Sequence, residues 1–328
     1  MGANGRLSVV VTRRLPDRVQ ARLAELFDVT LNDTDKPMSR NALHKAMQNA
    51  DAIVPTITDH IDADLIENAG DRLKLIAHYG SGTDNIDVAA AMARGIHVTN
   101  TPGVTTDDTA DIAMTLILSV IRRVGEGIKV TQDEHWAGWS PTAMLGGRIR
   151  GRKLGILGLG RIGRGFAERA QAFGMELHYH NRNQLRTETE ADLGVTYWPS
   201  LNQMLAQIDI LSINCPHTPA TFHIMNASRL QLMKPSAVII NTSRGEVLDD
   251  NALTRMLRAG ELAGAGLDVF ANGHDINPRL KDLPNVILLP HMASATLEGR
   301  EEMGERVILN LQSLANGHKP PDRVFGEV

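Results

Sequence analysis

Two side chains suited to charge and proton chemistry follow apolar runs in the last third of the sequence. Arg244 ends the segment Ile-Ile-Asn-Thr-Ser-Arg, and His291 ends the segment Leu-Leu-Pro-His. If both runs are parallel strands, both side chains lie at the carboxyl edge of a sheet, where open α/β proteins bind ligands. A guanidinium can clamp the carboxylate of a 2-oxo acid, and an imidazole can give a proton to its carbonyl oxygen. The simpler alternatives are a salt bridge or helix entry for Arg244 and a strand cap for His291.

A glycine-rich turn precedes these residues and predicts a dinucleotide site. The apolar run 154–157 leads into Gly158, Gly160 and Gly163 in G-x-G-x-x-G spacing, and a helical pattern follows. The first two glycines would allow a tight turn and close approach of a pyrophosphate, and the third would allow the helix to pack on the strand. Arg161 and Ile162 lie at the start of the helix, whose N–H groups would face the phosphates.

The residues about twenty positions further on bear on which nicotinamide cofactor is bound. An NAD-preferring site normally has Asp or Glu there, which accepts hydrogen bonds from the ribose hydroxyls. This chain has Asn181 and Arg182. A neutral amide and a guanidinium favour a 2′-phosphate, so we expect NADPH to be preferred, with NADH as the alternative. Arg182 as an ordinary solvated charge remains the other interpretation.

The rest of the sequence supplies elements that can position these residues. Short apolar runs alternate with helical stretches, which is typical of parallel βαβ units. Strands are predicted at residues 7–12, 52–55, 73–77 and 96–100, and then at 154–157, 176–180, 210–213, 237–241, 263–269 and 286–289. Helices are predicted at 16–27, 107–124 and 297–315. The last helix has no strand after it, so we expect it to pack on the part of the protein formed by the first four strands.

The length and this pattern predict two domains. A chain of 328 residues exceeds the usual size of one hydrophobic core. We expect an α/β protein of two doubly wound lobes, Rossmann- or flavodoxin-like, with the active-site cleft between them. Residues 1–101 and 292–328 would form the substrate domain, and residues 102–291 the NAD(P)-binding domain.

The composition excludes several classes of protein. A formal charge of −4 with 22% charged residues gives no basic face for nucleic acid, and no run reaches the length of a transmembrane helix. The single cysteine, Cys215, rules out an internal disulfide framework and fits a reducing compartment, so a cytoplasmic location is expected. We expect no metal site and a small-molecule substrate.

Four ordered motifs give the chain a resemblance to a known family. They are the glycine turn at 158–163, Asn-Thr-Ser-Arg-Gly at 241–245, Gly-Leu-Asp-Val-Phe at 266–270 and Pro-His-Met-Ala-Ser-Ala-Thr at 290–296. The sequence resembles the D-isomer-specific 2-hydroxyacid dehydrogenases, and within them the glyoxylate/hydroxypyruvate reductase or glycerate dehydrogenase branch. The resemblance spans nearly the whole chain, including 80–87 and 100–104. It implies NAD(P)H-dependent reduction of a small 2-oxo acid to the 2-hydroxy acid.

The resemblance also implies roles for further residues. The amides of Ser81 and Gly82 would hold the substrate carboxylate beside Arg244. Asp268 would contact the nicotinamide carboxamide. The cofactor groove would be lined by Cys215, which has no partnered base nearby and is not expected to act as a nucleophile, and by Thr242. A homodimer built on the cofactor lobes is implied too, with Trp136 or Trp139 reaching the neighbouring site; ordinary packing is the alternative for these tryptophans.

One family position differs in this chain. The family places a glutamate, which supports the catalytic histidine, five residues after the aspartate of Gly-Leu-Asp-Val, and here that residue is Gly273. Without the carboxylate, the imidazolium of His291 loses its charge partner, so the pKa of His291 should fall. Asp275 bending back, or His274 acting through water, would be substitutes. The preferred hypothesis is that His291 works alone.

Two other interpretations stay open at this stage. A catalytically impaired NAD(P)-binding sensor or interaction protein of the same fold would explain the missing glutamate, as corepressors of the carboxy-terminal-binding type resemble this family. An enzyme acting on phosphoglycerate, formate or a bulky 2-oxo acid is the other. A phosphoglycerate enzyme would need further cations near Ser81, and that segment has none.

Overall fold

The computed structural model describes residues 5–133, 136, 138–273 and 275–325. The chain divides into two compact units, one of residues 1–105 with 295–328 and one of residues 106–294. Each unit is built on one parallel β-sheet with helices on both faces, which is the predicted α/β, Rossmann-type architecture. Among the helices of the described ranges, none has both the length and the apolar character needed to cross a membrane.

The first unit has a five-stranded sheet in the order β2-β1-β3-β4-β5. Its strands are β1 (Ser8–Val11), β2 (Asp28–Thr30), β3 (Ala52–Val54), β4 (Leu75–Ala77) and β5 (His97–Thr99). Its helices are α1 (Asp17–Leu26), α2 (Arg40–Asn49), α3 (Ala63–Glu67), α4 (Val88–Ala93) and α13 (Leu297–Ala315). The helix α13 packs against α1 and β4, so it is part of the first unit.

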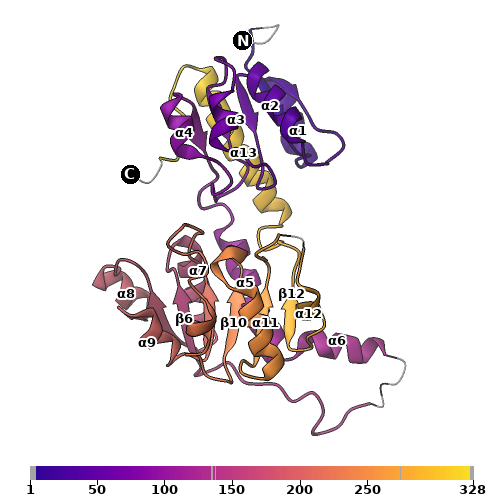
Figure 1. Ribbon diagram of the computed structural model, residues 1–328, viewed down its shortest axis with the longest axis vertical. Helices are drawn as coiled ribbons and strands as arrows, with labels where there is room; N and C mark the ends of the chain where they lie inside the picture. The colour runs from indigo at the N-terminus through magenta and orange to yellow at the C-terminus, as the bar shows by residue number, and fades with distance from the viewer. Residues whose placement is uncertain (1–4, 134–135, 137, 274, 326–328) are drawn as a thin grey trace. The chain divides into compact units, whose positions relative to one another are not determined.

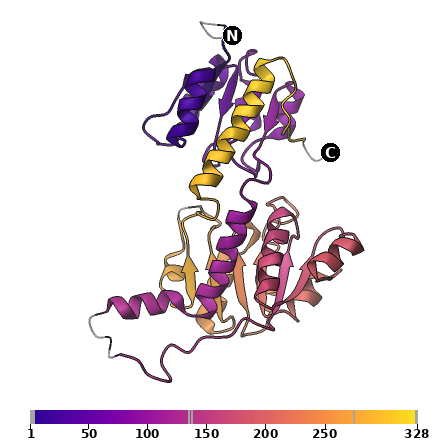
Figure 2. The same cartoon turned by 180° about the vertical axis from the view of Figure 1, so that it is seen from behind.

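Both faces of this sheet are buried. Val9 and Val11 on one face pack with α1 and α13, whereas Ile53 and Ile76 on the other face pack with α2, α3 and α4. Figure 2 shows α13, in yellow, lying along one face of the sheet. Strands that are buried on both faces have continuous apolar sequences. For this reason the apolar runs at β3 and β4 were sufficient to predict these strands.

The second unit has a seven-stranded sheet in the order β12-β11-β10-β9-β6-β7-β8. Its strands are β6 (Lys153–Leu157), β7 (Glu176–His180), β8 (Val195–Tyr197), β9 (Ile210–Ile213), β10 (Val238–Asn241), β11 (Gly264–Leu267) and β12 (Val286–Leu288). Its helices are α5 (Thr106–Ile121), α6 (Val124–Gln132), α7 (Arg161–Ala172), α8 (Thr187–Leu193), α9 (Leu201–Leu205), α10 (Ala227–Leu230), α11 (Asp250–Ala259) and α12 (Pro278–Lys281), with the 3₁₀ turn η1 (Gly245–Val247).

Two hydrophobic clusters cover the two faces of this sheet. Helices α5 and α7 pack on one face, and α9, α10 and α11 pack on the other (Figures 1 and 2). The chain order reverses around β6, because β7 and β8 continue to one side of it and β9 to β12 lie on the other. This reversal is a topological switch point, and ligands of doubly wound sheets bind beside such a point.

Two strands and one helix end differ from the sequence predictions. The edge strands β2 and β8 were not predicted; each has three residues, and only Val195 among the six is buried. Edge strands of three residues are too short to show the apolar pattern that marks a strand. The long helix predicted at 107–124 ends at Ile121, because Arg123 adopts a left-handed conformation with φ of 55°.

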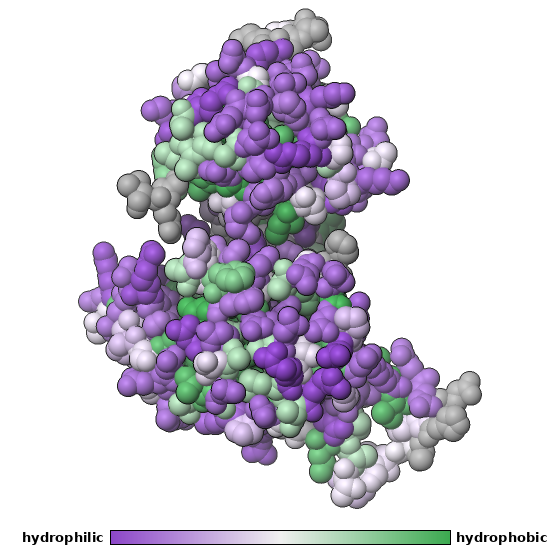
Figure 3. All heavy atoms as spheres, viewed as in Figure 1, coloured by the Kyte–Doolittle hydropathy of each residue, from purple (hydrophilic) through white to green (hydrophobic). Residues whose placement is uncertain are grey.

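Helix α6 and the segment after it carry exposed apolar side chains. Figure 1 shows α6 extending from the β12 edge of its own unit, and Figure 3 shows green and pale surface there. Val124 is 42% exposed, Ile128 52% and Leu145 66%, and no residue of α6 is buried. Apolar surface of this kind is typical of a protein contact.

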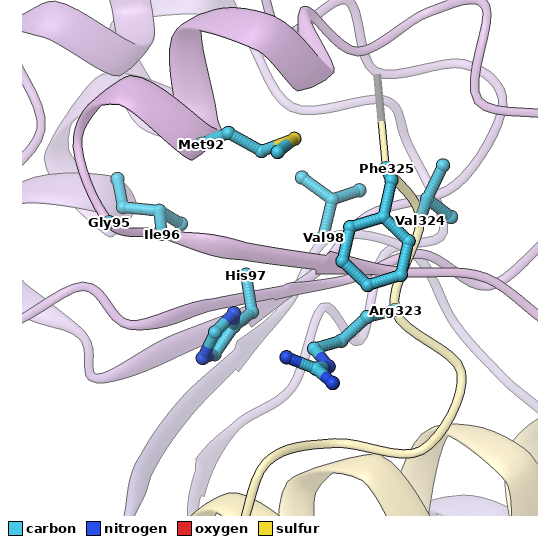
Figure 4. A pocket seen from close by; sticks show the side chains of 8 residues that line it. All are labelled: Met92, Gly95, Ile96, His97, Val98, Arg323, Val324 and Phe325. Carbon is cyan, nitrogen blue, oxygen red and sulfur yellow. The ribbon is translucent and has the colours of Figure 1, made fainter. Parts of the chain in front are cut away.

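The first unit has a small pocket beside its edge strand β5. Residues 323–325 form one wall of it, because Arg323 makes an antiparallel β-bridge with Thr99 and the N–H of Val324 donates to the carbonyl of Val98 at 2.8 Å (Figure 4). The pocket has a volume of about 170 Å³ and is lined by Met92, Gly95, Ile96, His97, Val98, Arg323, Val324 and Phe325. None of the residues predicted to bind substrate or cofactor lines it.

Candidate active site

The predicted chemistry-bearing residues of the second unit follow adjacent strands. Thr242 and Arg244 follow β10, Asp268 follows β11 and His291 comes shortly after β12. Since β10, β11 and β12 are neighbours and parallel, their carboxyl ends lie along one edge of the sheet. Cys215 follows β9 and Gly158 follows β6 at the same edge, on the two sides of the switch point.

The glycine turn after β6 has the close contacts that require glycine. Gly158 has φ of 97°, and a Cβ there would lie 2.6 Å from the backbone nitrogen of Cys215. A Cβ on Gly163 would lie 2.5 Å from the carbonyl oxygen of Gly158, so α7 packs directly on the turn. A Cβ on Gly160 would meet nothing within 4 Å, which leaves an open face on the turn.

Helix α7 begins at this turn with unused backbone donors. Gly160 is its N-cap, and the N–H groups of Arg161, Ile162 and Gly163 donate to no other residue in the part of the chain that the structure describes. The first N–H groups of a helix have no partner within the helix and carry partial positive charge. The turn and helix therefore form a cradle suited to a phosphate group.

Asn181 holds the glycine turn from the neighbouring strand. Its Oδ1 accepts a hydrogen bond from the N–H of Leu159 at 2.7 Å, a role that the sequence did not reveal. The next residue, Arg182, is exposed and pairs with no carboxylate among the described residues. The guanidinium is therefore available to a ligand at the end of β7.

Buried polar atoms at the ends of β9 and β10 also point to a ligand. The hydroxyl of Thr242 and Oδ1 of Asn214 are buried and have no hydrogen-bond partner among the described residues. Buried polar groups without partners are uncommon, and a bound polar molecule would satisfy them. Together with the glycine cradle, they fit a dinucleotide along this edge.

Cys215 lies at the same edge but is not set up as a nucleophile. Burial raises the pKa of its thiol to about 12. A reactive cysteine needs a lowered pKa, because the thiolate is the nucleophile. Cys215 therefore behaves as a small, buried apolar residue.

Arg244 is held by a side chain that sequence reasoning missed. Asn241 is fully buried, accepts from the N–H of Ser243 at 3.0 Å and donates from Nδ2 to the carbonyl of Arg244 at 2.9 Å. The next residue, Gly245, packs so closely on the segment after β11 that a Cβ would lie 1.9 Å from the carbonyl carbon of Phe270. The loop that carries Arg244 is therefore fixed on both sides of it.

His291 lies in an unusual backbone conformation. Its φ is 56°, in the left-handed region, and its side chain is exposed. The two following N–H groups donate to Asp268: Met292 to Oδ1 at 2.8 Å and Ala293 to Oδ2 at 2.8 Å. Asp268 is fully buried, and burial raises the pKa of its carboxyl group although these N–H donors and His291 act to lower it.

The segment at the missing glutamate is exposed. Gly273 has φ of 59°, and a Cβ there would meet nothing within 4 Å. The side chain of Asp275 is exposed, and its N–H donates to the carbonyl of Asn272. His274 lies outside the described residues. The two substitutes for the glutamate therefore stay predictions.

The first unit presents the loop predicted to bind the substrate carboxylate. Ser81 donates from its hydroxyl to the carbonyl of Thr101 at 3.0 Å, and Nδ2 of Asn100 donates to the carbonyl of Ser81 at 2.7 Å. Neither the Ser81 nor the Gly82 N–H donates to another residue that the structure describes. Asn100 and Thr101 are further residues that the sequence did not single out by role.

Histidines and carboxylates do not assemble a metal site in the part of the chain that the structure describes, where no group of three potential ligands occurs. The two histidines of β7, His178 and His180, are bound to Trp198 instead. Nδ1 of His178 accepts from the indole N–H of Trp198 at 3.2 Å, and Nδ1 of His180 lies 2.8 Å from the carbonyl of Trp198.

Comparison with known proteins agrees with this arrangement. The sequence model for the NAD binding domain of D-isomer specific 2-hydroxyacid dehydrogenases matches residues 114–293. The glyoxylate reductase of Thermococcus litoralis is 42% identical over 324 residues, which cover 98% of this chain and 97% of that protein. The chain belongs to the D-isomer specific 2-hydroxyacid dehydrogenase family. The glyoxylate reductase of Aeropyrum pernix is 43% identical over 326 residues, 98% of this chain and 96% of that protein.

Two solved structures of the family extend the comparison to the fold. A glyoxylate reductase from Paecilomyes thermophila superposes with a TM-score of 0.87 at 33% identity, covering 97% of this chain and 98% of that one. An NADPH-dependent glyoxylate/hydroxypyruvate reductase from Sinorhizobium meliloti, in complex with NADP and malonate, gives a TM-score of 0.84 at 33% identity, with 97% of each chain covered. The family membership and Rossmann-type fold predicted from sequence are confirmed.

Proposed function

We propose that this family member reduces glyoxylate, or a 2-oxo acid of similar size, to the 2-hydroxy acid with a nicotinamide cofactor. The observation that carries the proposal is the placement of Arg244, Asp268 and His291 after three adjacent parallel strands, beside a dinucleotide cradle. Relatives named glyoxylate reductase, 40 to 43% identical over nearly the whole chain, support the substrate class.

In the proposed mechanism each residue has a distinct role. Arg244 binds the substrate carboxylate as a planar fork, with the Ser81 and Gly82 amides as the contribution of the first unit. The same guanidinium polarises the adjacent carbonyl, and the imidazolium of His291 gives its proton to the carbonyl oxygen. A nicotinamide cofactor, when bound, would supply the hydride for the carbonyl carbon. The products would be the 2-hydroxy acid, the oxidised cofactor and neutral His291, which takes up a proton from solvent.

The cofactor is proposed to lie along the carboxyl edge of the second sheet. Gly158, Gly160 and Gly163 would accept the pyrophosphate, with the N–H groups of Arg161 and Ile162 donating to it. Thr242 and Cys215 would line the groove, and Asp268 would remain close to the nicotinamide. We propose a preference for NADPH, because Arg182 follows the strand where an NAD-preferring site has an acidic residue.

The proposed assembly is a homodimer through the second unit. The support is the exposed apolar surface of α6 and of the segment after it, where Trp136 is 57% exposed and Trp139 is 87% exposed. A reducing, cytoplasmic location is proposed from the single buried cysteine. Sedimentation velocity would test the dimer, since Ile128→Asp should shift the protein to monomers if this surface is the interface.

The test of the activity is the oxidation of NADPH and of NADH with glyoxylate and with hydroxypyruvate, followed at 340 nm. His291→Ala should lower kcat at pH 7 by at least a hundredfold, because no other described side chain is proposed to protonate the oxygen. Arg244→Lys should raise KM for the oxo acid, because a point charge replaces a bidentate fork. Wild-type protein that binds NADPH but turns over neither acid would contradict the proposal.

Gly273→Glu tests the missing glutamate in the same assay. The space at Gly273 is open, so the cost of the change is the left-handed backbone, about 1 kcal/mol. If His291 works without any charge partner, the new carboxylate should raise the pKa of His291 and move the pH profile of the reduction toward higher pH, whereas a profile identical to that of the wild type would count against His291 working alone. If turnover appears only in Gly273→Glu, the natural chain is a nucleotide-binding protein without this chemistry.

A further inference from the structure

The buried carboxylate of Asp268 lies where it can control His291. Its two oxygens accept one hydrogen bond each from Met292 and Ala293, the two residues that follow the histidine. Asp268 itself is fixed by its own backbone, since its N–H donates to the carbonyl of Asn241 at 2.9 Å. The carboxylate therefore ties the segment after β12 to the middle of the sheet.

The backbone at His291 needs such a tie. A residue other than glycine in the left-handed region is strained by roughly 1–2 kcal/mol, and it stays there only when its surroundings enforce it. His291 has φ of 56°, and Asp268 accepts from the N–H groups of the two residues on its carboxyl side and also from the backbone of His291 itself. Because φ and ψ of this residue set the direction of its Cα–Cβ bond, the hydrogen bonds that hold this backbone help to orient the imidazole.

Charge makes a second link between the two residues. Burial is the largest influence on Asp268 and leaves its pKa raised on balance, while the N–H groups of Met292 and Ala293 and the positive charge of His291 act in the opposite direction. Two N–H donors facing the two oxygens favour the ionised carboxylate. His291 is the charged side chain that acts on this buried carboxylate, so by reciprocity the carboxylate favours the imidazolium.

We propose that Asp268 is the positioning residue of His291: it fixes the turn that presents the imidazole and supplies the negative charge that a glutamate at position 273 would otherwise give. The chain then needs neither Asp275 nor His274 as a replacement. Asp268 acts through the backbone and the charge of His291 and transfers no proton itself. The kinetic consequence rests on the proposed function, whereas the structural claim does not.

The direct test is an NMR titration of the His291 imidazole in Asp268→Asn, with the resonance assigned by its loss in His291→Gln. The pKa of His291 should fall by about one unit, because an opposite charge nearby favours the protonated form. The matched control is Asp209→Asn. Asp209 is in the same unit and also accepts from a backbone N–H, that of Lys153 at 2.9 Å, but it lies just before β9, at the opposite end of the strands from His291. It should leave the titration of His291 unchanged.

Two further measurements separate this role from direct contact with the cofactor. NADPH affinity, measured by fluorescence, should stay within about threefold in Asp268→Asn, while kcat/KM for glyoxylate should fall at least tenfold at pH 7 and its pH profile should shift toward acid by the change in the pKa of His291. An unchanged His291 titration combined with a large loss of NADPH affinity would overturn the proposal and assign Asp268 to the cofactor. If no oxo acid is turned over, the titration still decides.

A measurement on the wild type covers the case in which Asp268→Asn fails to fold. Amide hydrogen exchange of Met292 and Ala293 should be slow, even though Met292 is 38% exposed, because both N–H groups are bound to a buried carboxylate. Exchange of both amides at the rate of an unprotected chain would overturn the proposal.

Discussion

The two units share one structural feature at the start of their central strands and differ at the other end of the same strands. In the first, Asp51 precedes β3, accepts from the N–H of Ser8 at 2.9 Å and donates its own N–H to the carbonyl of Ser8. In the second, Asp209 precedes β9 and makes the same two bonds with Lys153, at 2.9 and 2.8 Å. In each unit an aspartate thus ties the start of the first strand to the start of a neighbouring one.

The difference lies at the other end of the same strands. After β1, residues 12–16 are Thr-Arg-Arg-Leu-Pro, with no glycine, and α1 begins at Asp17 with Pro16 as its N-cap residue. After β6 come Gly158 and Gly160, and α7 begins with free N–H groups. The shared end stabilises the fold, and the divergent end is where we propose that the second unit binds its cofactor, since ligands of α/β sheets bind at the carboxyl edge.

The largest effect should come from filling the glycine turn. Gly158→Ala places a Cβ 2.6 Å from the nitrogen of Cys215, so the turn must move, and NADPH affinity should fall at least tenfold by fluorescence titration. The control is Gly260→Ala, which shares a positive φ of 71° but has nothing within 4 Å of the added Cβ. It should lose about 1 kcal/mol of stability and no affinity. Equal losses of affinity would contradict a binding role for the turn.

Next in size should be the effect of the paired aspartates on stability. Hydrogen bonds to Arg72 and Ser8 outweigh burial and lower the pKa of Asp51, as those to Lys234 and Lys153 do for Asp209. A lowered pKa means that each carboxylate stabilises the fold above its unfolded pKa, near 4, and that this is lost as pH falls through the folded value.

Asp51→Asn and Asp209→Asn should therefore each lower the free energy of unfolding by about 1–3 kcal/mol at pH 7 and by much less near pH 3. Urea denaturation at the two pH values measures this. A loss that is the same at both values would show that the charge is not what stabilises the two strand starts.

A smaller effect is expected at Arg182. Arg182→Ala should weaken NADPH binding roughly tenfold and leave NADH binding unchanged, because the guanidinium is proposed to meet only the 2′-phosphate. Arg14→Ala, which removes an exposed guanidinium after the first strand of the other unit, is the control and should change neither affinity. Equal losses for the two cofactors would remove the basis for an NADPH preference.

The smallest effect should be at Cys215. With a thiol pKa raised to about 12 by burial, the thiolate is scarce at neutral pH, so labelling by a thiol reagent should be slow in the folded protein. Cys215→Ala should keep kcat within about twofold. Rapid labelling with loss of activity would mean that the cysteine takes part in the chemistry.

Much of this could be predicted from sequence because it depends on local patterns. Strands buried on both faces have continuous apolar runs, and Gly158 to Gly163 follow one of them at fixed spacing. The edge strands β2 and β8 lack such runs. Asn181 and Asp268 could be singled out by type, but their bonds to Leu159 and to Met292 and Ala293 cross 22, 24 and 25 positions. Which N–H a carboxylate or amide meets at that separation is set by strand order, which the pattern does not give.

The most direct test of the central claim follows the hydride itself. Wild-type protein with [4,4-²H₂]NADPH and glyoxylate should yield glycolate carrying one deuterium at C2, detected by mass spectrometry, and His291→Ala should form almost none while still binding NADPH. Glycolate without deuterium, or no glycolate from a protein that binds both NADPH and glyoxylate, would contradict the account.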